Sequence, residues 1–218
     1  MADFLFTTAY PSDDNNWKAL RSLLRRCSRR LKFHEYAERF EEDVKFGADI
    51  AQVILNRLTT ERKIVKEVAG THVAGHYGLR PGESCVARVK HLIEGYKYIF
   101  AEDSEAFFAS PRSSLAQKHA KHFSSVFEEA PRNHELELPI PLVALAATAV
   151  HCALQEWKDG AFVKLPFHGN TYQDVYEHHV RVLEDILIER SKYHRLMSDI
   201  AGKIIAGAVP VDVGAMEE

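Results

Sequence analysis

The sequence is poor in cysteine. Its three cysteines, Cys27, Cys85 and Cys152, lie far apart in a chain of 218 residues and form no Cys-x-x-Cys pair. Secreted domains that are held together by disulfides carry more cysteines in an even number, so this pattern predicts reduced thiols in an intracellular protein. The first residues also lack the basic start and the long apolar run of a secretory signal peptide. We therefore expect the chain in the cytoplasm or the nucleus.

Long uncharged runs are also scarce, and the longest extends from Leu138 to Gln155. It contains Pro139, Pro141 and several polar residues, which predicts a buried core helix rather than a membrane span. We therefore expect no membrane association.

The chain has neither a repeat nor an excess of positive charge. Eleven glycines and eight prolines follow no period, which excludes collagen-like chains, and twelve Phe, eight Tyr and two Trp supply a core that a disordered protein lacks. Against 28 Lys and Arg stand 31 Asp and Glu, so the formal net charge is −3. No global field therefore attracts nucleic acid, and any basic binding surface must be local.

Apolar residues recur in steps of three and four through most of the chain, which predicts an all-α fold. After a short extended segment at residues 4–10, the predicted helical runs cover residues 17–31, 33–58 with a weak point at Gly47, 60–77 with Gly78 as C-cap, 85–96, 113–127, 141–157 and 171–187. The helix at about 141–157 is apolar on all sides and is expected to be the central element. No linker-like segment divides the chain. We predict one compact helical domain over residues 1–205 and a flexible tail over 206–218.

Two segments of the sequence resemble an uncharacterised domain family that is abundant in mushroom-forming fungi. The first is an Ile-Pro followed by an Ala-rich helix that ends in Ala-Leu-x-Glu-Trp-x-x-Gly, and it stands here at residues 140–160. The second is a Tyr-x-x-Val-Tyr-x-x-His-Val-x-x-Leu helix, which stands here as Tyr172, Val175, Tyr176, His179, Val180 and Leu183. Residues 98–100 and 107–111 are similar to the family's middle segment.

The resemblance spans roughly residues 60–200. It implies a fungal, intracellular, helical protein, and it brings no established activity and no catalytic residues.

Histidine is frequent, and two pairs of histidines have the close spacing that metal ligands on a helix can show. His72 and His76 have the i, i+4 spacing of two zinc ligands on a helix, but Val73 stands where a protease motif needs Glu. His119 and His122 lie beside lysines, as on a solvated face. With twelve histidines in the chain such spacings arise by chance, so we predict no metal site.

One set of aromatic residues could line a ligand site. Tyr172, Tyr176 and His179 share the inward face of one predicted helix, and Trp157 ends the central helix. A buried histidine needs partners for both ring nitrogens, and Glu156 or the indole of Trp157 could supply one. These residues form either a structural hydrogen-bonded network or the wall of a small-ligand pocket.

The sequence contains no recognisable catalytic constellation. There is no Gly-x-Ser-x-Gly, no Walker loop and no Gly-x-Gly-x-x-Gly, and Cys152 lies in so apolar a helix that its thiol should be inert. We predict no cofactor and name no catalytic residue, and we favour a binding module over an enzyme.

The most distinctive charge pattern lies between Trp17 and Lys32, where seven cations occur without an acid. The cations on one helical face, beside the apolar stripe, are Lys18, Arg21, Arg25, Arg29 and Lys32. Arginine suits phosphate oxygens because its guanidinium is a planar fork. The acidic residues between Glu35 and Asp43 follow directly and could neutralise this face within the fold.

Two functional hypotheses remain open. The first is an interaction module that contacts nucleic acid or an acidic protein through the basic helix at residues 17–32. The second is a small-molecule-binding or enzymatic domain around Trp157, Tyr172, Tyr176 and His179. Neither the physiological partner nor the oligomeric state follows from the sequence.

Overall fold

A computed structural model describes residues 22, 24–29, 32–99, 128–129 and 136–208, and within these the fold is helical as predicted. Its elements are α3 (His34–Glu42), α4 (Val44–His76), α5 (Glu83–Ile93), the 3-10 helix η1 (Glu94–Ile99), α8 (Ile140–Gln155), α9 (Gly169–Ile188) and α10 (Arg190–Ala208). Two short strands, β1 (Glu128–Glu129) and β2 (Leu136–Glu137), pair antiparallel. The extended segment predicted at 4–10 and the helix predicted at 113–127 lie outside the described residues.

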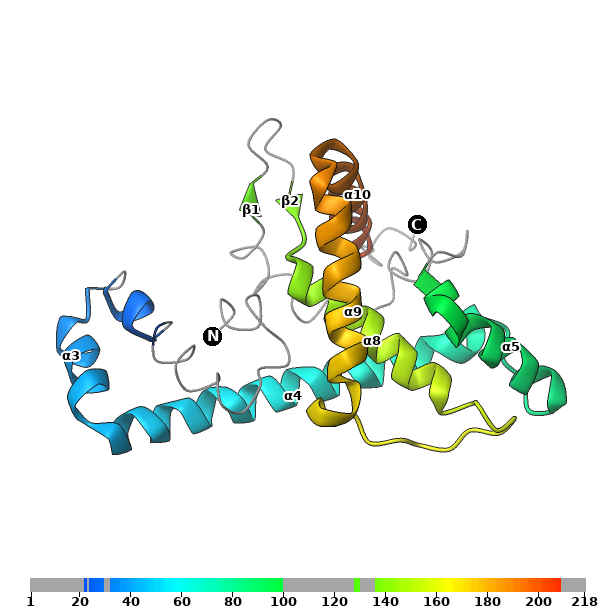
Figure 1. Ribbon diagram of the computed structural model, residues 1–218, viewed down its shortest axis with the longest axis horizontal. Coiled ribbons are helices and arrows are strands. Elements are labelled where there is room, and N and C mark those ends of the chain that lie inside the picture. The colour runs from blue at the N-terminus through cyan, green and yellow to red at the C-terminus, as the bar shows by residue number, and fades with distance from the viewer. Residues whose placement is uncertain (1–21, 23, 30–31, 100–127, 130–135, 209–218) are drawn as a thin grey trace, which may run out of the picture.

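Helix α8 is the central element, as its composition predicts. It begins directly after Pro139, with Pro141 in its first turn, where a missing backbone N–H costs nothing. Most of its residues are buried, and it packs against α4 on one side and α9 on another (Figure 1). Its buried hydroxyl is satisfied because Thr148 Oγ1 donates to the carbonyl of Ala144 across 2.7 Å.

The sequence predicts two helical runs that divide near Thr60, but the structure has one continuous helix, α4, across this position. The division lies instead at Asp43, whose carboxylate accepts a hydrogen bond from the amide of Phe46 and caps the helix. Thr60 does not act as a cap because its hydroxyl donates back to the carbonyl of Asn56 within the helix. The helix also continues through Gly47. It ends as predicted, with Gly78 at φ 64° and the amide of Leu79 bonded to the carbonyl of Ala74.

The first half of α4 projects beyond the main core and carries α3 at its end (Figure 1). A second, smaller core lies on this projecting half. Ala51, Ile54 and Leu58 are buried there, and Leu24 and Cys27 from the helical residues 24–29 pack against them. We call residues 24–29, α3 and the first half of α4 the distal arm.

At the opposite end of the molecule, two glycines hold the start of α5 close to the segment that follows α8. The amide of Gly82, just before α5, donates to the carbonyl of Gly160, which follows α8. Gly160 has φ 81°, and a Cβ atom there would lie 3.0 Å from the carbonyl oxygen of Gly82. Only glycine satisfies both conditions.

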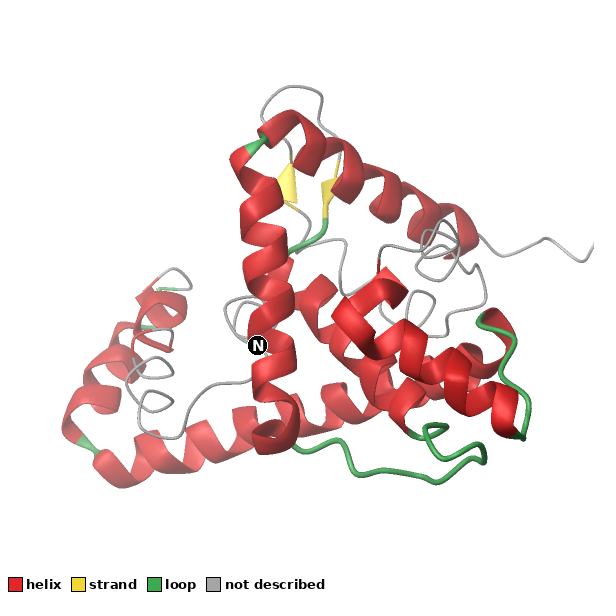
Figure 2. Cartoon of the chain, turned by 45° about the vertical axis from the view of Figure 1, so that its right-hand side comes forward, coloured by secondary structure: helices red, strands yellow, loops and turns green. Residues whose placement is uncertain are grey.

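Helices α9 and α10 form a hairpin at the C-terminal side. Helix α9 begins at Gly169 with no side-chain cap, so the predicted cap at Asn170 or Thr171 is wrong. The chain turns at Glu189, and α10 passes back over β1 and β2 (Figure 2). Buried Tyr193 and Met197 join α10 to the core. Helix α10 continues to Ala208 and thus enters the segment predicted as a tail, whose residues 209–218 lie outside the described part. Within the described ranges, no helix combines the length and the hydropathy that a membrane span requires.

Candidate functional site

The predicted basic helix ends in a hydrogen-bonded turn at the tip of the distal arm. The amide of Lys32 donates to the carbonyl of Arg29, and the amide of Phe33 donates to the carbonyl of Ser28. This pair of bonds defines a Schellman motif, whose left-handed position is usually glycine. Here Lys32 occupies it with φ 61°. The turn separates the basic helix from α3 and leaves the Lys32 side chain exposed.

The structure places three of the five predicted basic residues. Lys18 and Arg21 lie outside the described residues, and Arg25 is half-buried with a contact of its own. Arg29 and Lys32 are exposed, as is Arg26, which the sequence analysis did not assign to the basic face.

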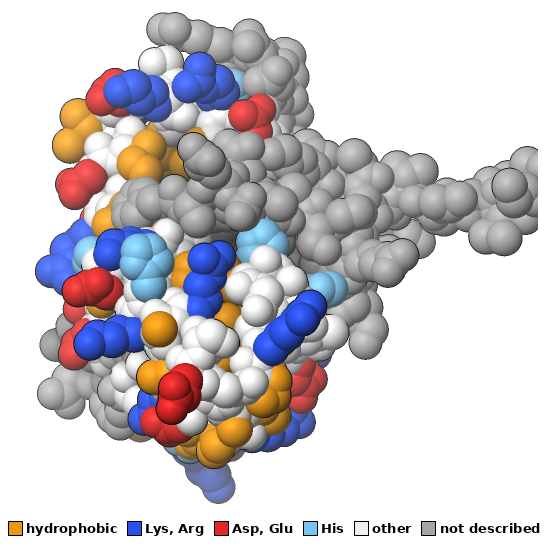
Figure 3. All heavy atoms as spheres, turned by 90° about the vertical axis from the view of Figure 1, so that its right-hand side faces the viewer, with side chains coloured by type: hydrophobic (Ala, Val, Ile, Leu, Met, Phe, Trp, Pro, Cys, Tyr) orange, Lys and Arg blue, Asp and Glu red, His pale blue; other side chains and the backbone are white. Residues whose placement is uncertain are grey.

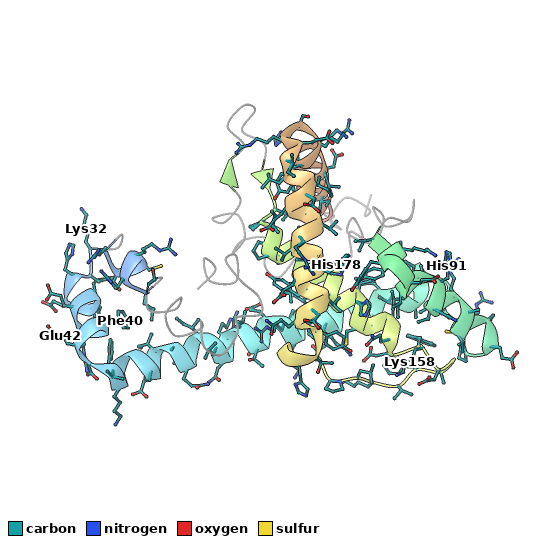
Figure 4. The ribbon with its side chains drawn as sticks, in the orientation of Figure 1. Lys32, Phe40, Glu42, His91, Lys158 and His178 are labelled. Atoms are coloured by element: carbon teal, nitrogen blue, oxygen red, sulfur yellow. The ribbon has the colours of Figure 1, made fainter. Side chains whose placement is uncertain are left out.

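The described acidic side chains of α3 form no ion pair with these cations. The ion pair formed within the acidic stretch joins Arg39 to Asp43 at 3.5 Å. In the described part of the chain, no ion pair connects Arg26, Arg29 or Lys32 to an acidic residue of α3. Figure 4 shows Lys32 at the top of the distal arm and Glu42 at its foot.

Two aromatic rings stand exposed beside these cations. Phe33 is 55% exposed and Tyr36 is 50% exposed, and their rings meet edge to face with centroids 6.0 Å apart. The helical period places both rings on the same face as Phe40, but of the three only Phe40 is buried, where it stacks on Phe46 at 5.1 Å. We call Arg26, Arg29, Lys32, Phe33 and Tyr36 the distal basic surface.

The predicted pocket residues do not form one wall. Trp157 is half-buried after the end of α8, and its ring contacts Phe162 at 5.7 Å. Tyr172, Tyr176 and His179 are buried on α9, as their spacing predicts. His179 bonds neither Glu156 nor Trp157: its Nε2 lies 2.7 Å from the hydroxyl oxygen of Tyr98 in η1.

Tyr172 and His179 instead belong to a cluster of rings from η1, α8 and α9. We call it the aromatic–histidine cluster, and its members are Tyr96, Tyr98, His151, Tyr172, His178 and His179. Tyr96 is its hub. Its ring stacks on His178 at 3.9 Å with an interplanar angle of 17°, and it lies 5.3 Å from His179 and 5.8 Å from His151. Figure 4 shows His178 projecting from α9 toward the end of the molecule that carries α5.

Two further hydrogen bonds in the same cluster link Tyr172 to His151 through Gln155. The hydroxyl of Tyr172 donates to Oε1 of Gln155 across 3.0 Å, and Nε2 of Gln155 lies 3.1 Å from Nε2 of His151. Sequence reasoning did not single out Tyr96, Tyr98 or Gln155. Their partners are on other helices, so the local period carries no signal for them.

Burial controls the protonation of this cluster. It lowers the pKa of His151 to about 4, and it lowers that of His179 to about 3 with help from the neighbouring His178 and His151. Burial also raises the pKa of Tyr98 well above its ordinary value. All three side chains are therefore neutral at physiological pH.

Two buried ring nitrogens in the cluster have no partner. Within the part of the chain that the structure describes, Nδ1 of His151 and Nδ1 of His179 make no hydrogen bond, although the residues are only 5% and 2% exposed. Unpaired buried polar groups are costly and call for an explanation. Those two nitrogens are the chemical feature of the cluster that a ligand could use.

Beside the cluster, a buried ion pair joins α4 to the end of α8. Lys66 Nζ donates to Oε1 of Glu156, which also accepts the amide of Leu165 at 2.9 Å. Glu156 Oε2 has no partner among the described residues. The pair fixes the segment between α8 and α9 against the core.

The described residues contain no group of three or more metal-ligating side chains. His72 and His76 both lie on α4, where each is half-buried, and His119 and His122 fall outside the described ranges. Burial raises the pKa of the Cys152 thiol and so opposes formation of a thiolate.

A family model for a domain of unknown function, DUF6532, matches residues 1–186. The chain belongs to this family. No curated protein and no solved structure matches it. The DUF6532 match confirms the resemblance to an uncharacterised domain and extends it toward the N-terminus, so the basic run at 17–32 is part of the DUF6532 domain. The match ends inside α9, and α10 follows it.

Proposed function

We propose that this DUF6532 protein is an interaction module that binds single-stranded nucleic acid through the distal basic surface. The observation that carries the proposal is the exposure of Arg26, Arg29 and Lys32, which have no acidic partner among the described residues, together with the exposed rings of Phe33 and Tyr36.

The chemistry of this surface suits a flexible phosphate backbone with accessible bases. Guanidinium groups bind phosphate oxygens with two parallel hydrogen bonds. Exposed aromatic rings stack on unpaired bases, and this contact tolerates any sequence because every base has a π-face. An acidic protein would use the cations but would gain less from the rings, so single-stranded nucleic acid is favoured.

The location of the surface also supports the proposal. The net charge of the chain is −3, so attraction to phosphate must come from a local patch. The distal arm projects from the main core (Figure 1), which gives an extended strand access to its tip. The end of the molecule that carries α5 mixes basic, acidic and hydrophobic side chains and offers no comparable patch in that view (Figure 3).

A cytoplasmic or nuclear site of action is part of the same proposal. Cys27, Cys85 and Cys152 all lie within the described residues and form no disulfide with one another, which supports a reducing compartment.

The test is a salt titration of binding to a labelled single-stranded oligonucleotide of mixed sequence. Each phosphate contact contributes about 0.7 to the slope of log affinity against log salt concentration, so replacing Arg26, Arg29 and Lys32 by Gln should lower the slope by about 2. A control variant replaces Arg80, Arg88 and Lys90 by Gln. These three residues are exposed at the other end of the molecule, so the net charge changes equally and the slope should not change.

Three results would contradict the proposal. The unmodified protein could fail to bind RNA or DNA single strands at low salt, the control variant could lose as much affinity as the distal variant, or the distal variant could bind as tightly as the unmodified protein. Salt-dependent binding of polyglutamate without binding of either nucleic acid would assign the surface to an acidic protein.

A further inference from the structure

The hydrogen bonds around His151 determine which of its nitrogens carries the proton. The Tyr172 hydroxyl donates to Oε1 of Gln155, so the amide nitrogen of Gln155 faces Nε2 of His151. An amide nitrogen donates and does not accept, and Nε2 must therefore accept with its lone pair. The ring proton of the neutral imidazole then lies on Nδ1, which is the buried nitrogen without a partner.

The same reasoning applies to His179. The Tyr98 hydroxyl is buried, and its one hydrogen bond in the described structure is to Nε2 of His179. If Nε2 carried the proton, the hydroxyl proton of Tyr98 would be left without an acceptor. Tyr98 therefore donates, and His179 carries its own proton on Nδ1. The cluster thus holds two imidazole N–H donors without acceptors, one from α8 and one from α9.

The ring that touches both histidines is held by an unusual backbone. Gly95 has φ 64° and ψ 20°, and Tyr96 has φ 56° and ψ 35°, so two consecutive residues are left-handed. A tyrosine seldom adopts this conformation, and such strain concentrates at binding and switching sites. Here it lays the half-buried Tyr96 ring flat on His178 and against His151 and His179.

We propose that the Tyr96 ring occupies a binding site for an uncharged, single-ring planar molecule that carries hydrogen-bond acceptors. When Tyr96 turns outward, the space it leaves is that of one six-membered ring. His178 supplies a stacking surface on one side. The rings of His151 and His179 lie 5.8 Å and 5.3 Å from the Tyr96 ring, so their unpartnered Nδ1–H groups are the donors within reach of a ligand in its place. The two donor histidines, His151 and His179, are neutral at physiological pH because burial lowers the pKa of each, which favours a neutral ligand over an ion. This site is separate from the distal basic surface, so its test succeeds or fails independently.

The first measurement uses the unmodified protein. Long-range proton–nitrogen NMR spectra of the histidine rings report which nitrogen is protonated. We expect the Nδ1–H form for both His151 and His179 at neutral pH. A spectrum that shows the Nε2–H form for either residue removes a donor from the site and overturns the proposal.

The second measurement uses Tyr96→Gly, which removes the ring while keeping a residue that tolerates positive φ. Pyrazine, a planar ring with two acceptor nitrogens, is compared with benzene, which has the same shape and no acceptor. Tyr96→Gly should bind pyrazine about tenfold more tightly than the unmodified protein does, and about tenfold more tightly than it binds benzene, since one or two net hydrogen bonds correspond to that ratio.

The donor groups are tested in the same background. Adding His151→Phe to Tyr96→Gly should reduce the preference for pyrazine over benzene, because only the His179 donor remains. Equal binding of pyrazine and benzene to Tyr96→Gly would show a merely apolar space, and absence of pyrazine binding would show no site; either result overturns the proposal. If Tyr96→Gly fails to fold, the NMR spectra of the unmodified protein decide, because pyrazine in excess should shift the Nδ1–H resonances of both histidines and benzene should not.

Discussion

Tyr98 donates its hydroxyl proton to Nε2 of His179 across 2.7 Å, and this bond joins η1 to α9 inside the core. The residues are 81 positions apart in the sequence, and both are almost fully buried. Tyr98 is also held through its backbone, since its carbonyl accepts the hydroxyl of Tyr77 at 3.1 Å. The bond therefore positions η1, and with it the Tyr96 ring.

Replacing Tyr98 by Phe should lower the free energy of unfolding by about 1–3 kcal/mol. The substitution keeps the ring and leaves Nε2 of His179 buried without a partner, which costs the desolvation of that group. Denaturant unfolding measures the effect. Tyr36→Phe is the matched control, because Tyr36 is 50% exposed, so a change within about 0.5 kcal/mol is expected. Equal stability of Tyr98→Phe and the unmodified protein would contradict the structure at this point.

The protein should lose stability in mild acid. Burial lowers the folded-state pKa of His151 from 6.5 to about 4 and that of His179 from 6.5 to about 3. As the pH falls below 6.5, the unfolded chain therefore binds protons that the folded chain does not. Each histidine should cost about 2 kcal/mol between about pH 8 and about pH 5, and the contribution is constant above neutral pH.

Denaturant unfolding across this pH range tests the acid sensitivity. His151→Gln removes one of the two buried titrating groups, so its loss of stability in acid should be smaller by about 2 kcal/mol. His91→Gln is the control because His91 is exposed on α5 (Figure 4), and its pH dependence should match that of the unmodified protein. A His151→Gln profile that is parallel to the unmodified one would refute the assignment.

Replacing Lys66 by Met should lower the free energy of unfolding by about 3–5 kcal/mol, because Glu156 would keep a buried charge without its counter-ion. The double variant Lys66→Met with Glu156→Gln removes both charges and keeps an acceptor for the amide of Leu165, so most of the loss should be recovered. Lys63→Met is the control. The Lys63 side chain is 74% exposed and lies 3.9 Å from Glu67, and such surface pairs contribute at most about 1 kcal/mol. If the single and the double variant have the same free energy of unfolding, the loss in Lys66→Met does not come from an unpaired charge on Glu156, and the prediction is wrong.

The helical class, the central position of α8 and the Gly78 cap were all predictable from the sequence. Each of these features is encoded locally: a helix with apolar residues on all of its faces must be buried, and a glycine after the last turn provides the left-handed conformation of a C-cap. The three widely spaced cysteines and the lack of a long apolar run can likewise be read directly from the sequence. The family resemblance also rests on short motifs and needs no tertiary information.

Where the sequence offers more than one helix cap or more than one buried ring, the tertiary structure decides between them. Thr60 and Asp43 both carry a side chain that can cap a helix. In the fold Asp43 caps α4, whereas the Thr60 hydroxyl bonds the carbonyl of Asn56 inside the continuous helix. Phe33 and Tyr36 follow the same period as Phe40, yet only Phe40 is buried and the other two rings stand exposed.

The aromatic–histidine cluster depends most on tertiary structure. His179 was recognisable as an inward residue, but its partner Tyr98 and the hub Tyr96 come from a segment far away in the chain. Periodicity reports which face of a helix is buried and carries no information on which buried faces meet. Hydrogen bonds between those faces, the neutral state of His151 and His179, and their two unpaired N–H groups are therefore consequences of how η1, α8 and α9 pack together.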